Sequence, residues 1–275
     1  MGYLSVACAD PGEMTNLVVR AGSRATRISA RVRRSGSDLL ILVHGLGCAK
    51  ESFDGAFESP ALDHLSICAF DLPGYGDSER WHDQGYSLES YAEATIGVIE
   101  ALRRAGADGR VFLVGHSMGG AVGLLAAERV PALGHCVSVE GNLTAEDCGL
   151  VSRQIASQMA SEFVPGGYES FLRELRNSPR KDLRAWASWY AGADPAAVHQ
   201  SATSLVQWSD SGKLLELFTK LPQTCSYIYG DEDGKHHLRP LLPHRDMHRI
   251  ADAGHFAMVD KPDEFYDLLA TLLSG

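Results

Sequence analysis

The stretch GHSMGG at residues 115–120 decides the fold of this chain. It follows the apolar run VFLV at 111–114 and leads directly into an alanine-rich segment, which predicts a strand, a sharp turn and a helix ending near Arg129. Small residues around the serine let the backbone turn tightly and let the helix pack close to the sheet. We expect Ser117 to be strained there, with its hydroxyl above the strand ends as a candidate nucleophile.

Strands and helices are predicted to alternate along most of the chain. The run LLILV at 39–43 is typical of a strand buried on both faces, and the mixed alternation before it is typical of an antiparallel pair at a sheet edge. The expected strands are 16–22, 26–34, 39–43, 65–70, 110–115, 135–140, 225–230 and 247–252, with further helices at 87–105 and 262–273. This order favours parallel β-α-β units with right-handed crossovers.

Residues 142–222 interrupt the alternation, since they contain several helical patterns and no convincing strand. We expect a helical cap, or lid, domain at 142–222, inserted into a core domain made of residues 1–141 and 223–275. Four aromatic residues are concentrated in the cap: Trp186, Trp189, Tyr190 and Trp208. They are candidate substrate contacts, and the alternative is that they pack the cap onto the core.

Composition excludes several classes of protein. The net charge of −10 and the pI near 5.5 argue against nucleic-acid and anionic-membrane partners. The chain begins without a basic, signal-like region, and no segment has the roughly 18 apolar residues that span a bilayer. The six cysteines form no C-x-x-C pair, so no metal site is predicted and a reducing, cytoplasmic setting is expected. We expect the basic cluster at Arg31, Arg33 and Arg34 to be solvated charges of an edge strand.

A serine hydroxyl needs a base to take its proton and a carboxylate to orient that base. His255 is the candidate base, because it follows the last predicted strand and precedes the last helix. Two carboxylates compete for the third position: Glu140 ends a predicted strand, and Asp233 follows the strand at 225–230. Asp71 also ends a strand, but we expect it to organise its own turn.

Backbone donors are needed for the negative charge that develops on a tetrahedral intermediate. The N–H of Met118, directly after the candidate nucleophile, is one expected donor. The second is the N–H of Leu46 in HGLG at 44–47, where the flanking glycines allow a close approach to a substrate oxygen. We expect His44 and Gly45 to contribute to substrate binding, with His44 ordering this loop.

Four motifs in this order, HGLG, DLPGYGDS, GHSMGG and AGHF, resemble those of the α/β-hydrolase superfamily. The resemblance covers about 16–142 and 222–275, and the intervening segment stands where a helical cap is usual. It implies an α/β fold with a mostly parallel, eight-stranded sheet flanked by helices. It also implies a triad of Ser117, His255 and an acid, an oxyanion hole at Leu46 and Met118, and no metal or organic cofactor.

The expected activity is hydrolysis of an ester, lactone or thioester through an acyl-enzyme. The substrate is expected to be a small to medium, partly apolar molecule. The alternatives are other chemistry at the same site, namely carbon–carbon hydrolysis, a lyase reaction or cofactor-free oxygenation, and a ligand-binding or receptor protein that retains the site. We expect a monomer or a homodimer.

Overall fold

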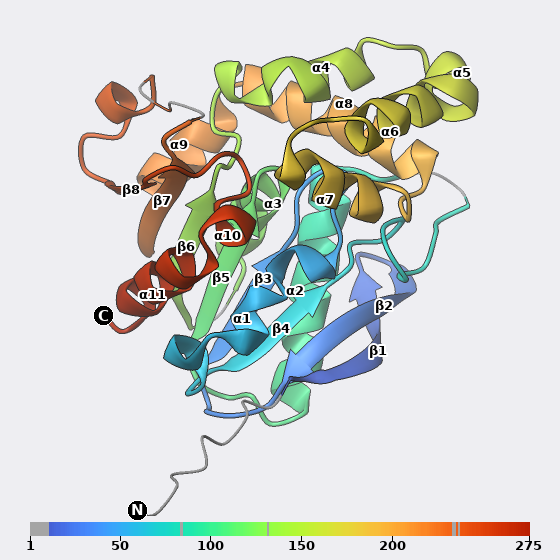
Figure 1. The fold of residues 1–275 in the computed structure, drawn as a ribbon. Helices are drawn as coiled ribbons and strands as arrows, with labels where there is room; N and C mark the ends of the chain where they lie inside the picture. The colour runs from blue at the N-terminus through green and yellow to red at the C-terminus, as the bar shows by residue number, and fades with distance from the viewer. Residues whose placement is uncertain (1–10, 83–84, 131, 233–234, 236) are drawn as a thin grey trace, which may run out of the picture.

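The computed structural model describes residues 11–82, 85–130, 132–232, 235 and 237–275. Its described residues build one eight-stranded sheet in the order β1-β2-β4-β3-β5-β6-β7-β8 (Figure 1). β2 runs antiparallel to both of its neighbours, and every later pair of neighbours is parallel. The strands are β1 (Glu13–Ala21), β2 (Arg24–Arg33), β3 (Leu39–Val43), β4 (Ser66–Phe70), β5 (Val111–His116), β6 (Leu133–Val139), β7 (Thr224–Gly230) and β8 (Asp246–Ile250). The predicted fold class is confirmed.

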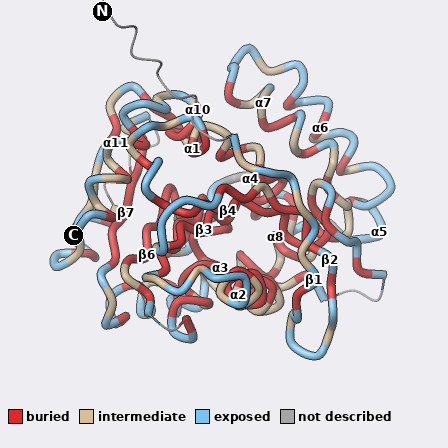
Figure 2. The backbone as a smooth tube through the Cα atoms, turned by 90° about the horizontal axis from the view of Figure 1, so that it is seen from below, coloured by how far each residue is buried: buried red, intermediate tan, exposed pale blue. Residues whose placement is uncertain are grey.

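Helices cover both faces of the sheet because its central strands are apolar on both sides. All five residues of β3 are buried, as are all six of β5. Figure 2 shows these buried strands between α2 and α3 on one side and α1, α10 and α11 on the other. The covering elements are η1 (Lys50–Phe53), α1 (Gly55–Glu58), η2 (Pro60–Leu62), α2 (Leu88–Arg104), α3 (Met118–Ala127), α10 (Ala257–Asp260) and α11 (Pro262–Leu273). The short η5 (Arg239–Leu241) lies in the connection between β7 and β8.

Between β6 and β7 the chain forms only helices, all of which lie within residues 142–222, here called the helical insertion. Figure 1 shows that most of them gather over one end of the sheet. They are η3 (Glu146–Cys148), α4 (Gly149–Ala156), α5 (Ala160–Glu162), η4 (Phe163–Gly167), α6 (Tyr168–Arg176), α7 (Lys181–Tyr190), α8 (Pro195–Asp210) and α9 (Lys213–Lys220). The insertion therefore covers the strand ends from which the candidate site residues come.

Part of the basic cluster differs from its expectation as solvated charges of an edge strand, since Arg31 and Arg33 lie on β2, whereas Arg34 follows the strand and is exposed. β1 is the edge strand, and β2 is covered by it on one side and by β4 on the other. Arg33 is only 2% exposed. Its guanidinium donates to the carbonyl oxygens of Phe57 and Leu62 and pairs with Asp63. The pattern of charges suggested a side chain exposed to solvent, but backbone carbonyls from a distant segment accept the hydrogen bonds of this buried arginine instead.

Candidate active site

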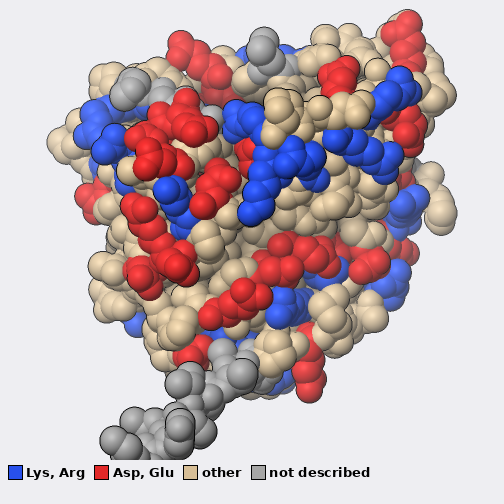
Figure 3. All heavy atoms as spheres, viewed as in Figure 1, with Lys and Arg blue, Asp and Glu red and all other residues tan. Residues whose placement is uncertain are grey.

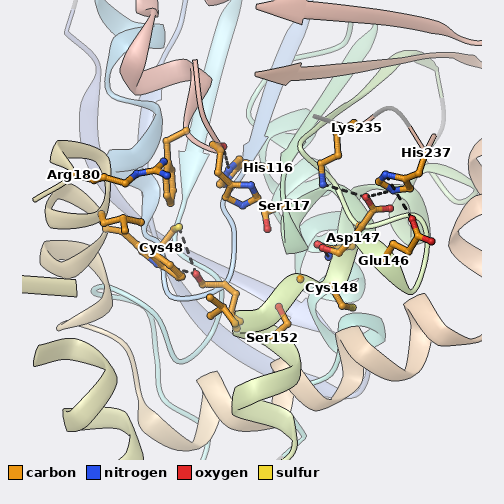
Figure 4. Close-up of a pocket in the computed structure, with 18 residues that line it drawn as sticks. Cys48, His116, Ser117, Glu146, Asp147, Cys148, Ser152, Arg180, Lys235 and His237 are labelled. Atoms are coloured by element: carbon orange, nitrogen blue, oxygen red, sulfur yellow. Dashed lines mark hydrogen bonds and ion pairs between the residues drawn. The ribbon is translucent and has the colours of Figure 1, made fainter. Parts of the chain in front are cut away.

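Ser117 lies in the tight turn between β5 and α3 with φ 51° and ψ −119°, a strained conformation for a residue with a side chain. Its N–H donates to the Val139 carbonyl at 2.8 Å, which ties the turn to the end of β6. Glycine is required around it, because a Cβ on Gly119 would lie 2.2 Å from the Val43 carbonyl oxygen. The turn directs the Ser117 hydroxyl into a cavity (Figure 4).

This cavity has a volume of about 530 Å³ and lies between the carboxyl ends of the strands and the helical insertion. The core contributes Ser117, Leu46, Cys48, His116, His255 and Phe256, while the insertion contributes Val151, Ser152, Arg180, Leu183 and Trp186 among others. A charged group that includes Asp147, Lys235 and His237 lines the same cavity. The cavity therefore offers an apolar wall and a strongly polar wall to one occupant.

His255 lines the same cavity from the loop between β8 and α10. His116 Nε2–H donates to the His255 carbonyl oxygen at 2.8 Å, and the two rings lie 4.9 Å apart, edge to face. The residue just before Ser117 thus anchors the loop that carries the candidate base. The sequence analysis missed this contact, since it joins positions 139 residues apart.

Glu140 follows β6 with φ 50°, and its carboxylate is fully buried. One oxygen, Oε1, accepts the N–H of Gly230 at 2.7 Å. The other, Oε2, lies 3.8 Å from His255 Nδ1 and 3.5 Å from Lys235 Nζ. Of the two candidate acids, Glu140 is thus placed beside His255, whereas Asp233 lies outside the described residues.

Asp147 is a second buried carboxylate at the cavity, and nothing in the sequence pattern had drawn attention to it. It accepts hydrogen bonds from Lys235 Nζ at 3.1 Å and from His237 Nε2 at 3.0 Å. The N–H groups of Leu143 and Thr144 donate to its other oxygen. Lys235 therefore joins the start of the helical insertion to Glu140, as the close-up shows for its bond to Asp147 (Figure 4).

The two expected oxyanion donors have N–H groups that donate to no described residue. Leu46 also lines the cavity. The loop that carries it is close to Ser117, because a Cβ added at Gly45 would lie 3.2 Å from the Ser117 Cβ. Uncommitted N–H groups beside a serine hydroxyl are what an oxyanion would require.

His44 is fully buried and lies behind this loop rather than among the cavity-lining residues. Its Nε2 accepts the N–H of Leu72 at 3.0 Å, so its Nδ1–H donates to the Gly45 carbonyl at 2.9 Å. Burial lowers the pKa of His44, and the charge of Asp71 only partly opposes this shift. A neutral His44 therefore joins the ends of β3 and β4.

The four aromatic candidates of the insertion occupy different places. Trp186 lines the cavity, whereas the other three are not among the described lining residues. Trp189 packs on Phe256, with ring centres 5.8 Å apart. Tyr190 is fully buried and stacks on Tyr168. Trp208 donates its Nε1–H to Glu89 at 2.8 Å and faces a separate hollow beside α9.

Two thiols, Cys48 and Cys148, line the cavity near Ser117 (Figure 4). Burial raises the pKa of the Cys48 thiol strongly and also raises the pKa of Cys148. Both sulfurs are therefore held as neutral thiols at neutral pH, and the thiolate is the nucleophilic form. Ser117 is the stronger candidate nucleophile in this cavity.

Comparison with known proteins identifies the class to which this fold and site belong. Residues 40–268 match the alpha/beta hydrolase family. The chain belongs to that family. Over 259 residues it is 38% identical to the hydrolase YugF of Bacillus subtilis, covering 86% of this chain and 90% of YugF.

A second relative has a named substrate. The chain is 26% identical over 253 residues to the 2-hydroxy-6-oxo-6-(2'-aminophenyl)hexa-2,4-dienoic acid hydrolase of Metapseudomonas resinovorans, covering 86% of this chain and 83% of that protein.

Solved structures share the fold. The N-acyl homoserine lactonase AidH, in complex with N-butanoyl homoserine, superposes with a TM-score of 0.75 at 21% identity, over 95% of this chain and 96% of that one. A thermophilic esterase from Thermogutta terrifontis gives a TM-score of 0.74 at 18% identity, over 95% and 98% of the two chains. At these identities the likeness concerns the fold.

Among the described residues, no helix is both long and apolar enough to cross a bilayer.

Proposed function

We propose that this member of the alpha/beta hydrolase family is a serine hydrolase that cleaves a carboxylic ester, lactone or thioester through an acyl-enzyme. The observation that carries the proposal is the strained Ser117, whose hydroxyl faces a cavity shared with His255 and with the uncommitted N–H of Leu46. A strained, over-determined backbone at a cavity is typical of a functional residue.

The first half of the reaction forms the acyl-enzyme. Ser117 Oγ attacks the carbonyl carbon while His255 takes its proton, and the carbonyl oxygen becomes an oxyanion between the N–H groups of Leu46 and Met118. The tetrahedral intermediate then collapses. Its bond to the leaving oxygen or sulfur breaks, and His255 returns the proton to that leaving group.

The second half releases the acid. Water attacks the acyl carbon, His255 takes a proton from the water, and the bond to Ser117 Oγ breaks as that oxygen regains a proton. Glu140 supports this cycle as the acid, because its buried charge lies 3.8 Å from His255 Nδ1 and favours the protonated imidazole. The described contacts of Glu140 therefore support it for this role, while Asp233 lies outside the described residues.

In this proposal the helical insertion is a cap that shapes the substrate cavity. Leu183, Trp186 and Val151 give the cavity an apolar wall, whereas Asp147, Lys235 and His237 give it a charged one. A cavity of about 530 Å³ suits a small to medium molecule with an apolar part and a hydrogen-bonding part.

The test combines covalent labelling with turnover. Wild-type protein is expected to react with a fluorophosphonate probe and to hydrolyse a short-chain p-nitrophenyl ester. Ser117→Ala should abolish labelling and lower kcat by about a thousandfold or more, with an unchanged circular dichroism spectrum. Ser188→Ala, an exposed serine of α7 outside the cavity lining, is the matched control. Equal labelling of wild type and Ser117→Ala would remove Ser117 from the mechanism.

A second candidate, carbon–carbon hydrolysis of a keto acid, is favoured by one feature of the cavity. Arg180 lines it while pairing with Asp182 at 2.6 Å. Lys and Arg side chains gather across the upper part of the face in Figure 3, where their positive charge would attract an anion although the chain has a net charge of −10. The Metapseudomonas resinovorans relative is named for a dienoic acid substrate. Comparing kcat/KM for such an acid with kcat/KM for esters separates the two reactions.

A further inference from the structure

α7 of the helical insertion is hydrogen-bonded directly to the loop that carries a proposed oxyanion donor. Trp186 Nε1–H donates to the Leu46 carbonyl oxygen at 3.1 Å, across 140 positions of sequence. The Trp186 side chain is buried, so this bond is shielded from water. The Cys48 thiol is a second and more distant donor to the same oxygen, at 3.6 Å.

The packing of α7 on this loop leaves no spare space. Gly47 has φ 66°, and a Cβ added there would lie 2.4 Å from Tyr190 Cδ2 and 3.0 Å from Trp186 Nε1. Trp186 also packs on Phe256, with ring centres 5.8 Å apart, and Phe256 directly follows His255. One side chain of the insertion therefore contacts both the loop at 44–47, here called the oxyanion loop, and the loop that carries His255.

The polar atom of Trp186 is committed to the protein backbone. Its indole N–H donates to the Leu46 carbonyl, so the part of Trp186 that can contact a substrate is its apolar ring. A buried indole N–H needs an acceptor in any case, and here the acceptor is the carbonyl of the residue whose N–H is the proposed oxyanion donor.

We propose that Trp186 is a positioning residue for the oxyanion hole, an inference that rests on the proposed hydrolase function. The N–H of Leu46 shares a peptide plane with the Gly45 carbonyl, which accepts from His44 Nδ1–H at 2.9 Å and from the Cys48 N–H at 3.1 Å. The Leu46 carbonyl belongs to the next peptide plane, which Trp186 holds. With both planes held, φ and ψ of Leu46 are fixed, and the direction of its N–H with them. A donor aimed in advance stabilises an oxyanion without reorganisation. Since Trp186 belongs to the insertion, the hole is complete only when the insertion is packed over the cavity.

The test measures binding to the ground state and to an oxyanion mimic separately, after fluorophosphonate labelling of wild type has established the serine site. In Trp186→Phe, kcat for a p-nitrophenyl ester should fall about tenfold while KM stays within about twofold. The affinity for a trifluoromethyl ketone, which forms an oxyanion on the serine, should fall by the same factor of about ten. A tenfold change corresponds to about 1.4 kcal/mol, which is within the range of one hydrogen bond. Trp186→Met, which fills the space differently, should give the same pattern.

Tyr168→Phe is the matched control, because its hydroxyl also donates to backbone carbonyls within the insertion, those of Tyr190 and Ala193, and does not touch the oxyanion loop. It should leave kcat and ketone affinity within about twofold of wild type. An increase in KM alone for Trp186→Phe, or unchanged ketone affinity, would overturn the inference. So would failure of both Trp186 variants to fold, since Trp186 would then serve the fold. A wild type that the probe does not label removes the hydrolase proposal itself, and this inference with it.

Discussion

At the scale of single residues, Ser117 and Glu140 share one backbone device. Both are residues with side chains at positive φ, 51° and 50°, at the ends of the neighbouring strands β5 and β6. Each donates its N–H at 2.8 Å to a carbonyl of the next strand, Ser117 to Val139 and Glu140 to Ile228. Such a conformation costs about 1–3 kcal/mol and persists only where its surroundings hold it. The same backbone conformation therefore places the proposed nucleophile at the cavity and the proposed acid beside His255, which lines that cavity.

Replacing each candidate acid with its amide tests the assignment of Glu140. Glu140→Gln keeps an oxygen for the Gly230 N–H but removes the charge beside His255. We expect kcat for a p-nitrophenyl ester to fall by about a hundredfold or more, because the protonated imidazole loses its counter-charge. Asp233→Asn should change kcat by less than about threefold. The reverse ranking of the two variants would assign the role to Asp233.

At the scale of elements, Asp71 joins the segments that follow β3 and β4, as expected for a residue that organises its own turn. Its carboxylate accepts the backbone N–H groups of Lys50 and Asp77 and the Lys50 ammonium at 2.7 Å. Burial alone lowers the pKa of Lys50, but Asp71 and Glu51 outweigh it and raise the pKa. The buried lysine is therefore charged and depends on Asp71. This ion pair holds in place the segment that follows the oxyanion loop.

Asp71→Asn should lower the free energy of unfolding by about 3 kcal/mol, because it leaves the buried Lys50 ammonium without its main counter-charge. Urea denaturation followed by circular dichroism gives this value. Asp77→Asn is the control, since the Asp77 side chain is 77% exposed and contacts the same lysine at 3.2 Å. It should cost less than about 1 kcal/mol. Similar losses in both variants would show that the buried pair contributes nothing special.

At the scale of the whole molecule, burial keeps some ionisable groups uncharged, and the stability of the fold should depend on pH as a result. His135 on β6 is 6% exposed and lies between the Leu272 carbonyl and the Ser226 hydroxyl. Burial lowers the pKa of His135 from the ordinary 6.5, as it does for His44. Below that pH the unfolded chain binds protons that the folded protein does not, so acid favours unfolding.

We therefore expect the urea midpoint to be lower at pH 5.5 than at pH 7.5, and this difference to shrink in His135→Gln, which cannot take up the proton. The exposed His244 provides a control, because His244→Gln should leave the pH dependence as in wild type. A pH dependence that is identical in all three proteins would place its origin in groups other than His135.

Local pattern was sufficient for the order of strands and helices and for the turn at Ser117. Apolar runs such as 39–43 and glycine next to Ser117 carry that information within a few residues, since hydrophobic periodicity and turn geometry are short-range properties. The position of the helical segment between β6 and β7 could be recognised for the same reason.

Contacts between distant segments could not be read from such patterns. The approach of Glu140 to His255, the burial of Asp147 with Lys235 and the hydrogen bond from Trp186 to Leu46 each join residues far apart in the chain. Trp186 and Trp208 look equivalent as letters, yet one lines the cavity and the other bonds to Glu89 on α2. Which charges meet and which aromatic ring faces a substrate depend on how the insertion packs over the sheet, and the folded chain alone defines that packing.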